Sequence, residues 1–266
     1  MENCRKNGRF LVLGSSHSYY GVKTDCLPGA YNLSFVSQNL MQDRVIFETF
    51  LAKPQKLEYV VVPVSVFSFF ENTEKVPAWR RGAYVRYWGF PEKNFLEKFF
   101  IFDNMPHQLR QYIKLQKKIR RKGACAVFNL SPTGWGEDQP VLPRNKGFQI
   151  AARKAARRHL AGNLNNITCF YELKKIISLA QNNNIKVILF TPPALPCYWK
   201  NISRKQERKM RELIAQLKEE PGVFYIDLMR SGYFKDKDFG DADHLAEKGA
   251  EKLARLLYKF ARNSGK

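Results

Sequence analysis

The sequence predicts an α/β fold: a three-layer α/β/α sandwich with a parallel central sheet. Two observations lead to this prediction. Apolar runs with the composition of buried strands alternate along the chain with segments whose apolar residues recur at helical spacing. One run, Tyr59–Val66, is apolar almost throughout, which is typical of a central parallel strand covered on both faces. We expect one domain over residues 1–266, because a chain of 266 residues with 44% hydrophobic residues can fill one large core.

Strand and helix patterns follow one another in the order that such a sheet requires. Five strands are predicted, at Phe10–Leu13, Tyr31–Phe35, Tyr59–Val66, Ile185–Phe190 and Val223–Asp227. Pro63 lacks the N–H group that a ladder needs, so we expect the third of these strands to end or bulge there. Between Ser16 and Tyr20 the chain begins a helix or a tight loop. Helices are predicted at Asn39–Ala52, Gln108–Lys122 and Tyr171–Gln181, from a Ser203 cap to Glu219, and at Leu245–Ala261.

Residues 71–165 differ in composition from the rest of the chain. Aromatic residues are frequent there, and the segment Ser131–Gly136 combines Pro, Gly and Trp135 in the manner of an ordered loop. We interpret 71–165 as an aromatic-rich insertion or lid within the single domain. Trp135 either faces the substrate or packs against the core, and the sequence leaves both interpretations open.

The chain is strongly basic, with 45 Lys and Arg against 24 Asp and Glu and a net charge of +21. Such a charge favours an anionic partner, and we expect an anionic membrane surface or an anionic polymer. Nucleic acid is the less favoured partner, because no recognition-helix, RNP-type or zinc-finger pattern accompanies the basic residues. The simpler alternative is that the basic clusters are solvated helix faces. These clusters are Lys114, Lys117, Lys118, Arg120, Arg121 and Lys122; Arg144, Lys146, Arg153, Lys154, Arg157 and Arg158; and Arg204, Lys205, Arg208, Lys209 and Arg211.

Five widely spaced cysteines without a Cys-x-x-Cys pair predict neither a disulfide framework nor a zinc site. His107 and His159 have no cysteine or carboxylate at metal-ligand spacing, so we expect no metal and no cofactor. The sequence shows no apolar signal region before Gly14, and no run of about 18 apolar residues that could span a membrane. These features predict a cytoplasmic protein, or one that is peripheral to a membrane.

Two short motifs near the ends of the chain can carry chemistry. Gly14-Ser15-Ser16 follows the first strand, and Asp241-x-x-His244 precedes the last helix. In open α/β folds both positions deliver side chains to the carboxyl edge of the sheet, where ligand sites lie. A serine hydroxyl becomes a nucleophile when a histidine removes its proton and a carboxylate orients that histidine. Together the two motifs predict a catalytic triad of Ser16, His244 and Asp241.

Each motif taken alone also has a simpler interpretation. Ser15 or Ser16 could cap a helix, and Asp241 or Asp243 could cap the last one. Asp243 also competes with Asp241 for the acid role, although its adjacency to His244 makes its geometry the poorer one. The catalytic interpretation is favoured because the two motifs occur at the two ends of one α/β pattern.

This layout resembles the SGNH (GDSL-like) hydrolase and acyltransferase superfamily, which has a nucleophile after the first strand and Asp-x-x-His before the last helix. It is most similar to the branch with Gly-Ser-Ser at the nucleophile. That branch includes the D-alanyl-transfer protein of teichoic acid synthesis and proteins that acylate bacterial polysaccharides. The strand end Leu189-Phe190-Thr191-Pro192-Pro193 is also similar to this branch. The resemblance implies an SGNH, flavodoxin-like sheet, with Ser16 as nucleophile, His244 as base and Asp241 as acid.

The residues expected for an oxyanion hole depart from that superfamily. The resemblance implies a glycine after the second strand and an asparagine after the third, but the chain has serines in those regions. Backbone amides at Ser16 and near Ser37, with the hydroxyl of Ser65 or Ser68, are expected to hold the oxyanion instead. One such donor contributes about 2.7–4 kcal/mol of transition-state stabilisation. His17 beside the nucleophile either lines the site or simply begins a helix.

We therefore expect a serine-dependent esterase or O-acyltransferase that acts on acyl esters of a glycan or cell-envelope polysaccharide, with acetyl as the favoured acyl group. The acyl group would pass to water or to a sugar hydroxyl, and the triad chemistry is the same in both cases. Two other classes remain open: a catalytically inactive SGNH-like module that binds glycan, and a basic nucleic-acid-binding protein.

Overall fold

The centre of the molecule is a five-stranded sheet in which all strands are parallel, in the order β2-β1-β3-β4-β5. A computed structural model describes residues 2–53, 55–72, 84–85, 88–90, 113–114, 116–118, 120–121, 129–139, 141–142 and 146–264. The strands are β1 (Phe10–Val12), β2 (Ala30–Asn32), β3 (Tyr59–Pro63), β4 (Lys186–Thr191) and β5 (Val223–Asp227). This is the flavodoxin-like strand order, whose switch point lies beside β1. The predicted parallel α/β sheet is confirmed.

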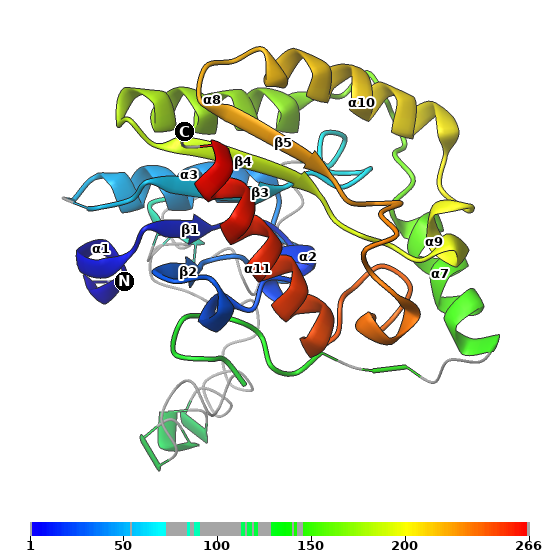
Figure 1. The fold of residues 1–266 in the computed structure, drawn as a ribbon, viewed down its shortest axis with the longest axis horizontal. Coiled ribbons are helices and arrows are strands. Elements are labelled where there is room, and N and C mark those ends of the chain that lie inside the picture. Colours follow the sequence, from blue (N-terminus) through cyan, green and yellow to red (C-terminus); the bar gives the residue numbers. More distant parts are fainter. Residues whose placement is uncertain are drawn as a thin grey trace.

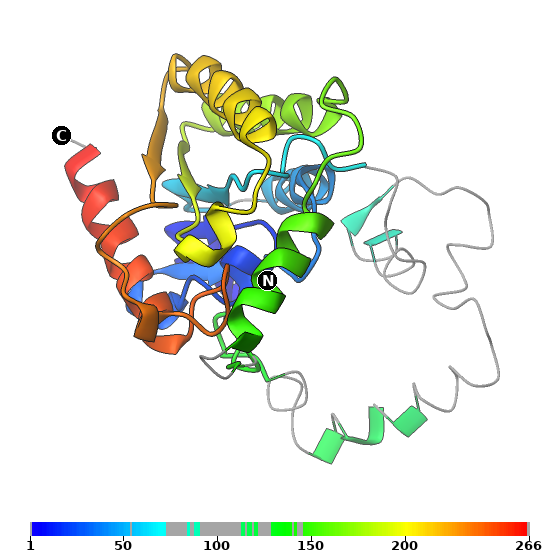
Figure 2. The same cartoon turned by 90° about the vertical axis from the view of Figure 1, so that its right-hand side faces the viewer.

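Helices cover both faces of the sheet and complete the three layers. Helix α11 lies on one face, and α3, α8 and α10 lie on the other (Figures 1 and 2). The helices are α1 (Glu2–Asn7), α2 (Ser16–Tyr19), α3 (Leu40–Leu51), α7 (Lys146–Arg158), α8 (Thr168–Asn182), α9 (Pro196–Trp199), α10 (Arg204–Lys218) and α11 (Glu247–Ser264). Short 3-10 turns occur at Thr24–Cys26 and Asp236–Asp238. None of the helices within the described residues has the length and apolar composition that a membrane span requires.

Local signals explain where several of these elements begin and end. The side chain of Asn39 accepts a hydrogen bond from the backbone N–H of Gln42, and the Gln42 side chain accepts one from the Asn39 N–H, which caps α3. Ser203 caps α10 in the predicted position. Strand β3 ends at Pro63, as the missing N–H predicts. Strand β2 is shorter than predicted because Asn32 turns the chain: its side-chain oxygen accepts a hydrogen bond from the N–H of Ser34.

The region between β3 and α8 is the part that the sequence predicts least well. Helix α7 was predicted only as a basic cluster, because alanines make up most of its apolar stripe, which comprises Phe148, Ala152, Ala155 and Ala156. The basic helix predicted at 108–122 lies largely outside the described residues, and the described ones, 113–114, 116–118 and 120–121, are helical. About half of the insertion predicted at 71–165 lies outside them as well, so it stays a prediction, as does the single domain.

A glycine at the end of β1 allows the chain to turn toward the carboxyl edge of the sheet. Gly14 has φ +113°, a conformation that residues with a side chain rarely adopt. A Cβ atom at this position would lie 2.3 Å from Cγ of Pro63, which ends the neighbouring strand β3. Only glycine therefore permits this approach, and the turn that it makes places Ser15 and Ser16 at the sheet edge.

Candidate active site

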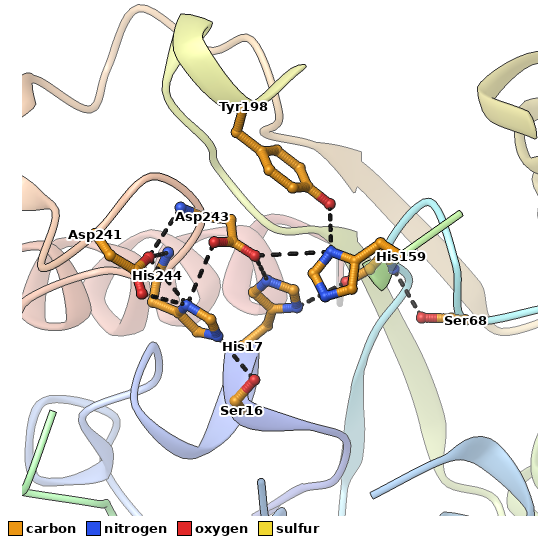
Figure 3. Close-up of polar contacts among 9 residues, drawn as sticks. Ser16, His17, Ser68, His159, Tyr198, Asp241, Asp243 and His244 are labelled. Carbon is orange, nitrogen blue, oxygen red and sulfur yellow. Dashed lines mark hydrogen bonds and ion pairs between the residues drawn. The ribbon is translucent and has the colours of Figure 1, made fainter. Parts of the chain in front are cut away.

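Ser16, His244 and Asp241 meet at the carboxyl edge of the sheet (Figure 3). Ser16 is the first residue of α2, and the other two residues lie in the loop that precedes α11. The Ser16 Oγ lies 2.8 Å from Nε2 of His244. The Nδ1 of His244 lies 3.0 Å from each carboxylate oxygen of Asp241. The structure thus brings together the three side chains that the sequence combined as a triad, at hydrogen-bond distances.

The Asp241 carboxylate is held in place by its own loop. Its Oδ1 accepts hydrogen bonds from the backbone N–H groups of His244 at 2.8 Å and Asp243 at 3.0 Å. This loop lies before α11, which begins only at Glu247, so neither aspartate occupies the capping position of that helix. Ser15 does occupy the N-cap position of α2, but its side chain makes no capping hydrogen bond. The simpler interpretation of the two motifs as helix caps therefore does not fit the structure.

The Ser16 and His244 side chains line a cavity of about 750 Å³. Its wall mixes apolar and polar groups: the rings of Tyr20, Phe67 and Phe70 lie among the polar side chains of Ser37, Asn39, Asn72, Gln139, Asn163 and Asn166. Such a mixture of amides, hydroxyls and aromatic faces suits a polar organic ligand of this size.

Two backbone N–H groups are available to a developing negative charge beside Ser16. Those of Ser16 and Ser37 donate to no acceptor within the described part of the chain. Ser37 lines the cavity and has φ +58°, so a turn in the left-handed region sets the direction of its amide. The prediction that backbone amides at Ser16 and near Ser37 form the oxyanion hole is compatible with this arrangement.

A buried carboxylate connects the two turns that carry these amides. Oδ1 of Asp43 accepts hydrogen bonds from the N–H of Gly14 at 2.8 Å and from Nε2 of Gln38 at 2.7 Å. Burial raises the pKa of Asp43 to about 7, although both hydrogen bonds favour its charged form. Sequence reasoning missed this residue, because Asp43 lies in the first turn of α3, where an acidic residue is ordinary.

The predicted hydroxyl donors from the segment after β3 do not reach the cavity. Oγ of Ser65 lies 2.9 Å from Nδ1 of His17, and Ser65 is 5% exposed. The Ser68 Oγ accepts a hydrogen bond from the backbone N–H of Ser65 at 2.9 Å. Both side chains therefore face the protein interior beneath His17, so the structure corrects the prediction that they hold the oxyanion. The turn between Ser65 and Ser68 sets the direction of both side chains. A strand pattern in the sequence does not predict that turn.

His17 and Trp135 also lie away from the cavity wall. His17 is 6% exposed, and its ring is stacked on that of His244 at 4.8 Å. Trp135 is 6% exposed, and its Nε1 donates a hydrogen bond to the carbonyl of Tyr20 at 2.7 Å. Trp135 therefore packs against the core and does not face the cavity. His17 packs against the buried face of the His244 ring and does not line the cavity.

Asp243 lies at the centre of a buried group of histidines behind His244 (Figure 3). Its Oδ1 is 3.6 Å from Nδ1 of His244, and its Oδ2 is 3.5 Å from Nε2 of His17 and 3.8 Å from Nδ1 of His159. Nδ1 of His159 is 2.8 Å from the hydroxyl of Tyr198. Oδ2 of Asp243 is buried without a hydrogen-bond partner among the described residues. The sequence did not predict His159 as a neighbour of Asp243, because the two residues are far apart along the chain and only the fold brings them together.

These surroundings shift the histidine pKa values in opposite directions. Burial lowers the pKa of His17, and it lowers that of His159 to about 3, so both rings are neutral at pH 7. Burial also acts to lower the pKa of His244, but the charge of Asp243 and the hydrogen bond with Asp241 outweigh it, and the pKa is raised. The ring that faces Ser16 is therefore the one that best holds a proton.

A metal ion is the other occupant that this group of side chains suggests. Donor atoms of His17, Asp243 and His244 lie within 4.8 Å of one another. Imidazole lone pairs lie in the ring plane, and the two stacked rings are only 19° from parallel, so a single ion cannot lie in both planes. Nδ1 of His244 is moreover engaged by Asp241. We therefore interpret the group as a set of hydrogen bonds and charge interactions.

Comparisons with known proteins identify a family but no activity. The model of a family described as "Protein of unknown function (DUF1574)" matches residues 2–260. No curated protein matches the chain. A Bacteroides fragilis structure with a provisional acylhydrolase assignment aligns at 16% identity, covering 96% of this chain and 87% of its own, with a TM-score of 0.44. A GDSL-like lipase from Bacteroides thetaiotaomicron aligns at 12% identity, covering 99% of this chain and 91% of its own, with a TM-score of 0.45.

Proposed function

The chain belongs to the DUF1574 family of proteins of unknown function, and we propose that it is a serine-dependent esterase or O-acyltransferase acting on acyl esters of a glycan. One observation carries the proposal: the side chains of Ser16, His244 and Asp241 are joined by hydrogen bonds at the wall of one cavity. This is the arrangement that activates a serine hydroxyl for attack on an acyl group.

In the proposed reaction, the Ser16 Oγ attacks the acyl carbonyl while Nε2 of His244 takes its proton. Asp241 holds the opposite ring nitrogen and stabilises the imidazolium. The carbonyl oxygen becomes an oxyanion that the N–H groups of Ser16 and Ser37 can stabilise. The tetrahedral intermediate then collapses, His244 gives the proton to the departing alcohol oxygen, and the acyl group remains on Ser16.

The second half of the reaction needs an acceptor for this acyl group. Water or a sugar hydroxyl attacks the acyl-serine, and His244 again takes the proton of the attacking oxygen. Attack by water releases a carboxylic acid, whereas attack by a sugar hydroxyl gives a new ester. Both outcomes regenerate the Ser16 hydroxyl, so the same residues serve hydrolysis and transfer.

A glycan is the favoured substrate class because of the cavity wall. The side-chain oxygens of Asn39, Asn163 and Asn166 accept local hydrogen bonds, so their NH₂ groups are the donors that they offer to sugar hydroxyls. The rings of Phe67 and Phe70 offer apolar faces. Acetyl is the acyl group we propose, and a cell-envelope polysaccharide is the proposed source of the glycan. A location in the cytoplasm or at a membrane surface, with an anionic polymer or lipid surface as partner, remains part of this proposal.

A second candidate is a catalytically inactive module that binds glycan, and the absence of Ser65 from the cavity wall favours it. The Ser65 hydroxyl contacts His17 instead, so only backbone amides remain of the predicted oxyanion donors. Binding of acetylated glycan without turnover, unchanged by Ser16→Ala, would identify this class. The nucleic-acid-binding alternative predicts retention on DNA or RNA that falls steeply with salt.

The proposed enzyme is tested by turnover of 4-nitrophenyl acetate and of an acetylated oligosaccharide. We expect the wild-type protein to release 4-nitrophenol, and the Ser16→Ala and His244→Ala variants to lose at least about 10⁴-fold in kcat with unchanged thermal stability. Adding sugar acceptors then separates transfer from hydrolysis. A Ser16→Ala variant with wild-type turnover would exclude this site as the source of activity.

A further inference from the structure

Helix α7 brings an arginine to the wall of the same cavity. Arg158 is the last residue of α7 and lines the cavity together with Ser16 and His244. The helix has no acidic residue, and its cations are Lys146, Arg153, Lys154, Arg157 and Arg158. Its buried stripe packs the helix onto the body of the protein near α9 (Figure 2). The result is a cationic side chain in the wall of the cavity that the candidate nucleophile also lines.

The Arg158 guanidinium has no ion pair and no hydrogen bond with any residue that the structure describes. Other arginines of this protein do have carboxylate partners. Arg9 makes two hydrogen bonds to Glu58, and Arg230 makes two to Glu207. A guanidinium presents five N–H donors in a fixed plane that matches a carboxylate or a phosphate. Arg158 therefore offers this recognition surface to a ligand in the cavity.

The backbone that carries Arg158 is fixed by its neighbour. The carbonyl of His159 accepts a hydrogen bond from Nε2 of Gln206 at 2.9 Å, and the His159 ring contacts the hydroxyl of Tyr198 at 2.8 Å. The N–H of His159 donates to the carbonyl of Ala155. The backbone at Arg158 is therefore fixed, whereas its side chain is exposed and can turn toward a ligand in the cavity.

Neither acidic residue of the cavity wall forms an ion pair with this arginine among the described residues. Asp241 is engaged by His244 through both of its oxygens. Burial raises the pKa of Glu71 to about 8, so this carboxyl is largely neutral at pH 7. The positive charge of Arg158 also acts on the site itself, because it opposes protonation of His244 and His159. An anionic ligand would remove this opposition.

We propose that Arg158 forms an anion-binding subsite beside Ser16, and that the ester substrate carries a carboxylate or phosphate group on its alcohol part. This inference rests on the proposed esterase or acyltransferase function and adds the charge of the substrate to it. The two anions share the geometry that a guanidinium recognises, and a uronic acid or a phosphorylated sugar would supply them. The net charge of +21 then contributes by steering such a polymer toward the cavity.

The test compares aryl acetates that carry a charged or a neutral group at the same ring position. The kcat/KM values are measured for 4-acetoxybenzoate, for its neutral isostere 4-acetoxybenzamide, and for 4-acetoxyphenyl phosphate, with wild type, Arg158→Met and Arg153→Met. Arg153 lies on the same helix and does not line the cavity, so it is the matched control. We expect wild type to prefer at least one anionic ester by about tenfold over the amide, with a preference that falls as ionic strength rises.

Arg158→Met is expected to abolish this ratio, and Arg153→Met to leave it unchanged. The anion that is preferred distinguishes the carboxylate source from the phosphate source. Equal kcat/KM for charged and neutral esters in wild type, or a ratio that survives Arg158→Met, would overturn the subsite. If no ester is turned over, the proposed enzyme fails, and binding of 4-hydroxybenzoate and phenyl phosphate to the protein by calorimetry still decides the subsite. Binding that is lost in Arg158→Met supports it, and binding that is absent or unaltered overturns it.

Discussion

The two sides of the His244 ring differ in how they contact their neighbours. On the side that opens to the cavity, Ser16 and Asp241 lie at 2.8 and 3.0 Å, within hydrogen-bond reach. On the buried side, Asp243 approaches Nδ1 of His244 only to 3.6 Å, and the ring of His17 is stacked at 4.8 Å. Proton transfer needs the short contacts, whereas a charge acts over longer distances in a buried, weakly polar environment. We therefore expect the open side to move the proton and the buried side to stabilise the charge that results.

The largest difference between the two sides should appear on neutralising the two carboxylates in turn. Asp241→Asn replaces the acceptor that holds the Nδ1 proton of His244, which favours the wrong tautomer, and we expect kcat to fall by about 10⁴-fold. Asp243→Asn removes only a charge that contacts His244 at longer range, so we expect a loss of about tenfold in kcat, or about 1.4 kcal/mol of transition-state stabilisation. Steady-state turnover of one ester by both variants measures this contrast. Equal losses would contradict the division of roles.

The pH dependence sharpens the role of Asp243. The general base must be neutral, so kcat/KM rises with pH through the pKa of His244. Because the charge of Asp243 raises that pKa, Asp243→Asn should lower it and move the acid limb of the profile to lower pH. Asp236→Asn is the control, since Asp236 is exposed and lies outside the group. A profile that stays in place in Asp243→Asn would mean that the buried carboxylate does not act on the base.

The smallest effect on catalysis is expected at His17. His17→Phe retains an aromatic ring against His244 but leaves the buried hydroxyl of Ser65 without its imidazole partner. Losing buried polar partners costs about 1–3 kcal/mol, so we expect the free energy of unfolding to fall by that amount and kcat by less than about tenfold. Urea denaturation and kcat for the same sample check both values. A loss of kcat as large as that of Asp241→Asn would show that His17 itself takes part in proton transfer.

The sheet and the open side of the site follow from sequence patterns, and the buried side does not. Apolar runs predict the strands because burial on both faces leaves a continuous signal, and strand ends place Ser16 and Asp241-x-x-His244 at one edge. The direction of a single side chain depends on turn conformation, and for this reason Ser65 faces inward. His159 follows a helix whose stripe is mostly alanine, and only tertiary packing brings it to Asp243.

The central claim is that Ser16 is an activated nucleophile. Labelling with a fluorophosphonate, followed by mass spectrometry of the peptides, tests it directly, because this reagent reacts with a serine whose proton a base can take. We predict one adduct, located on Ser16 in wild type and in Ser15→Ala, and none in Ser16→Ala or His244→Ala. An unlabelled wild-type protein, or an adduct on another residue that persists in Ser16→Ala, would contradict the claim.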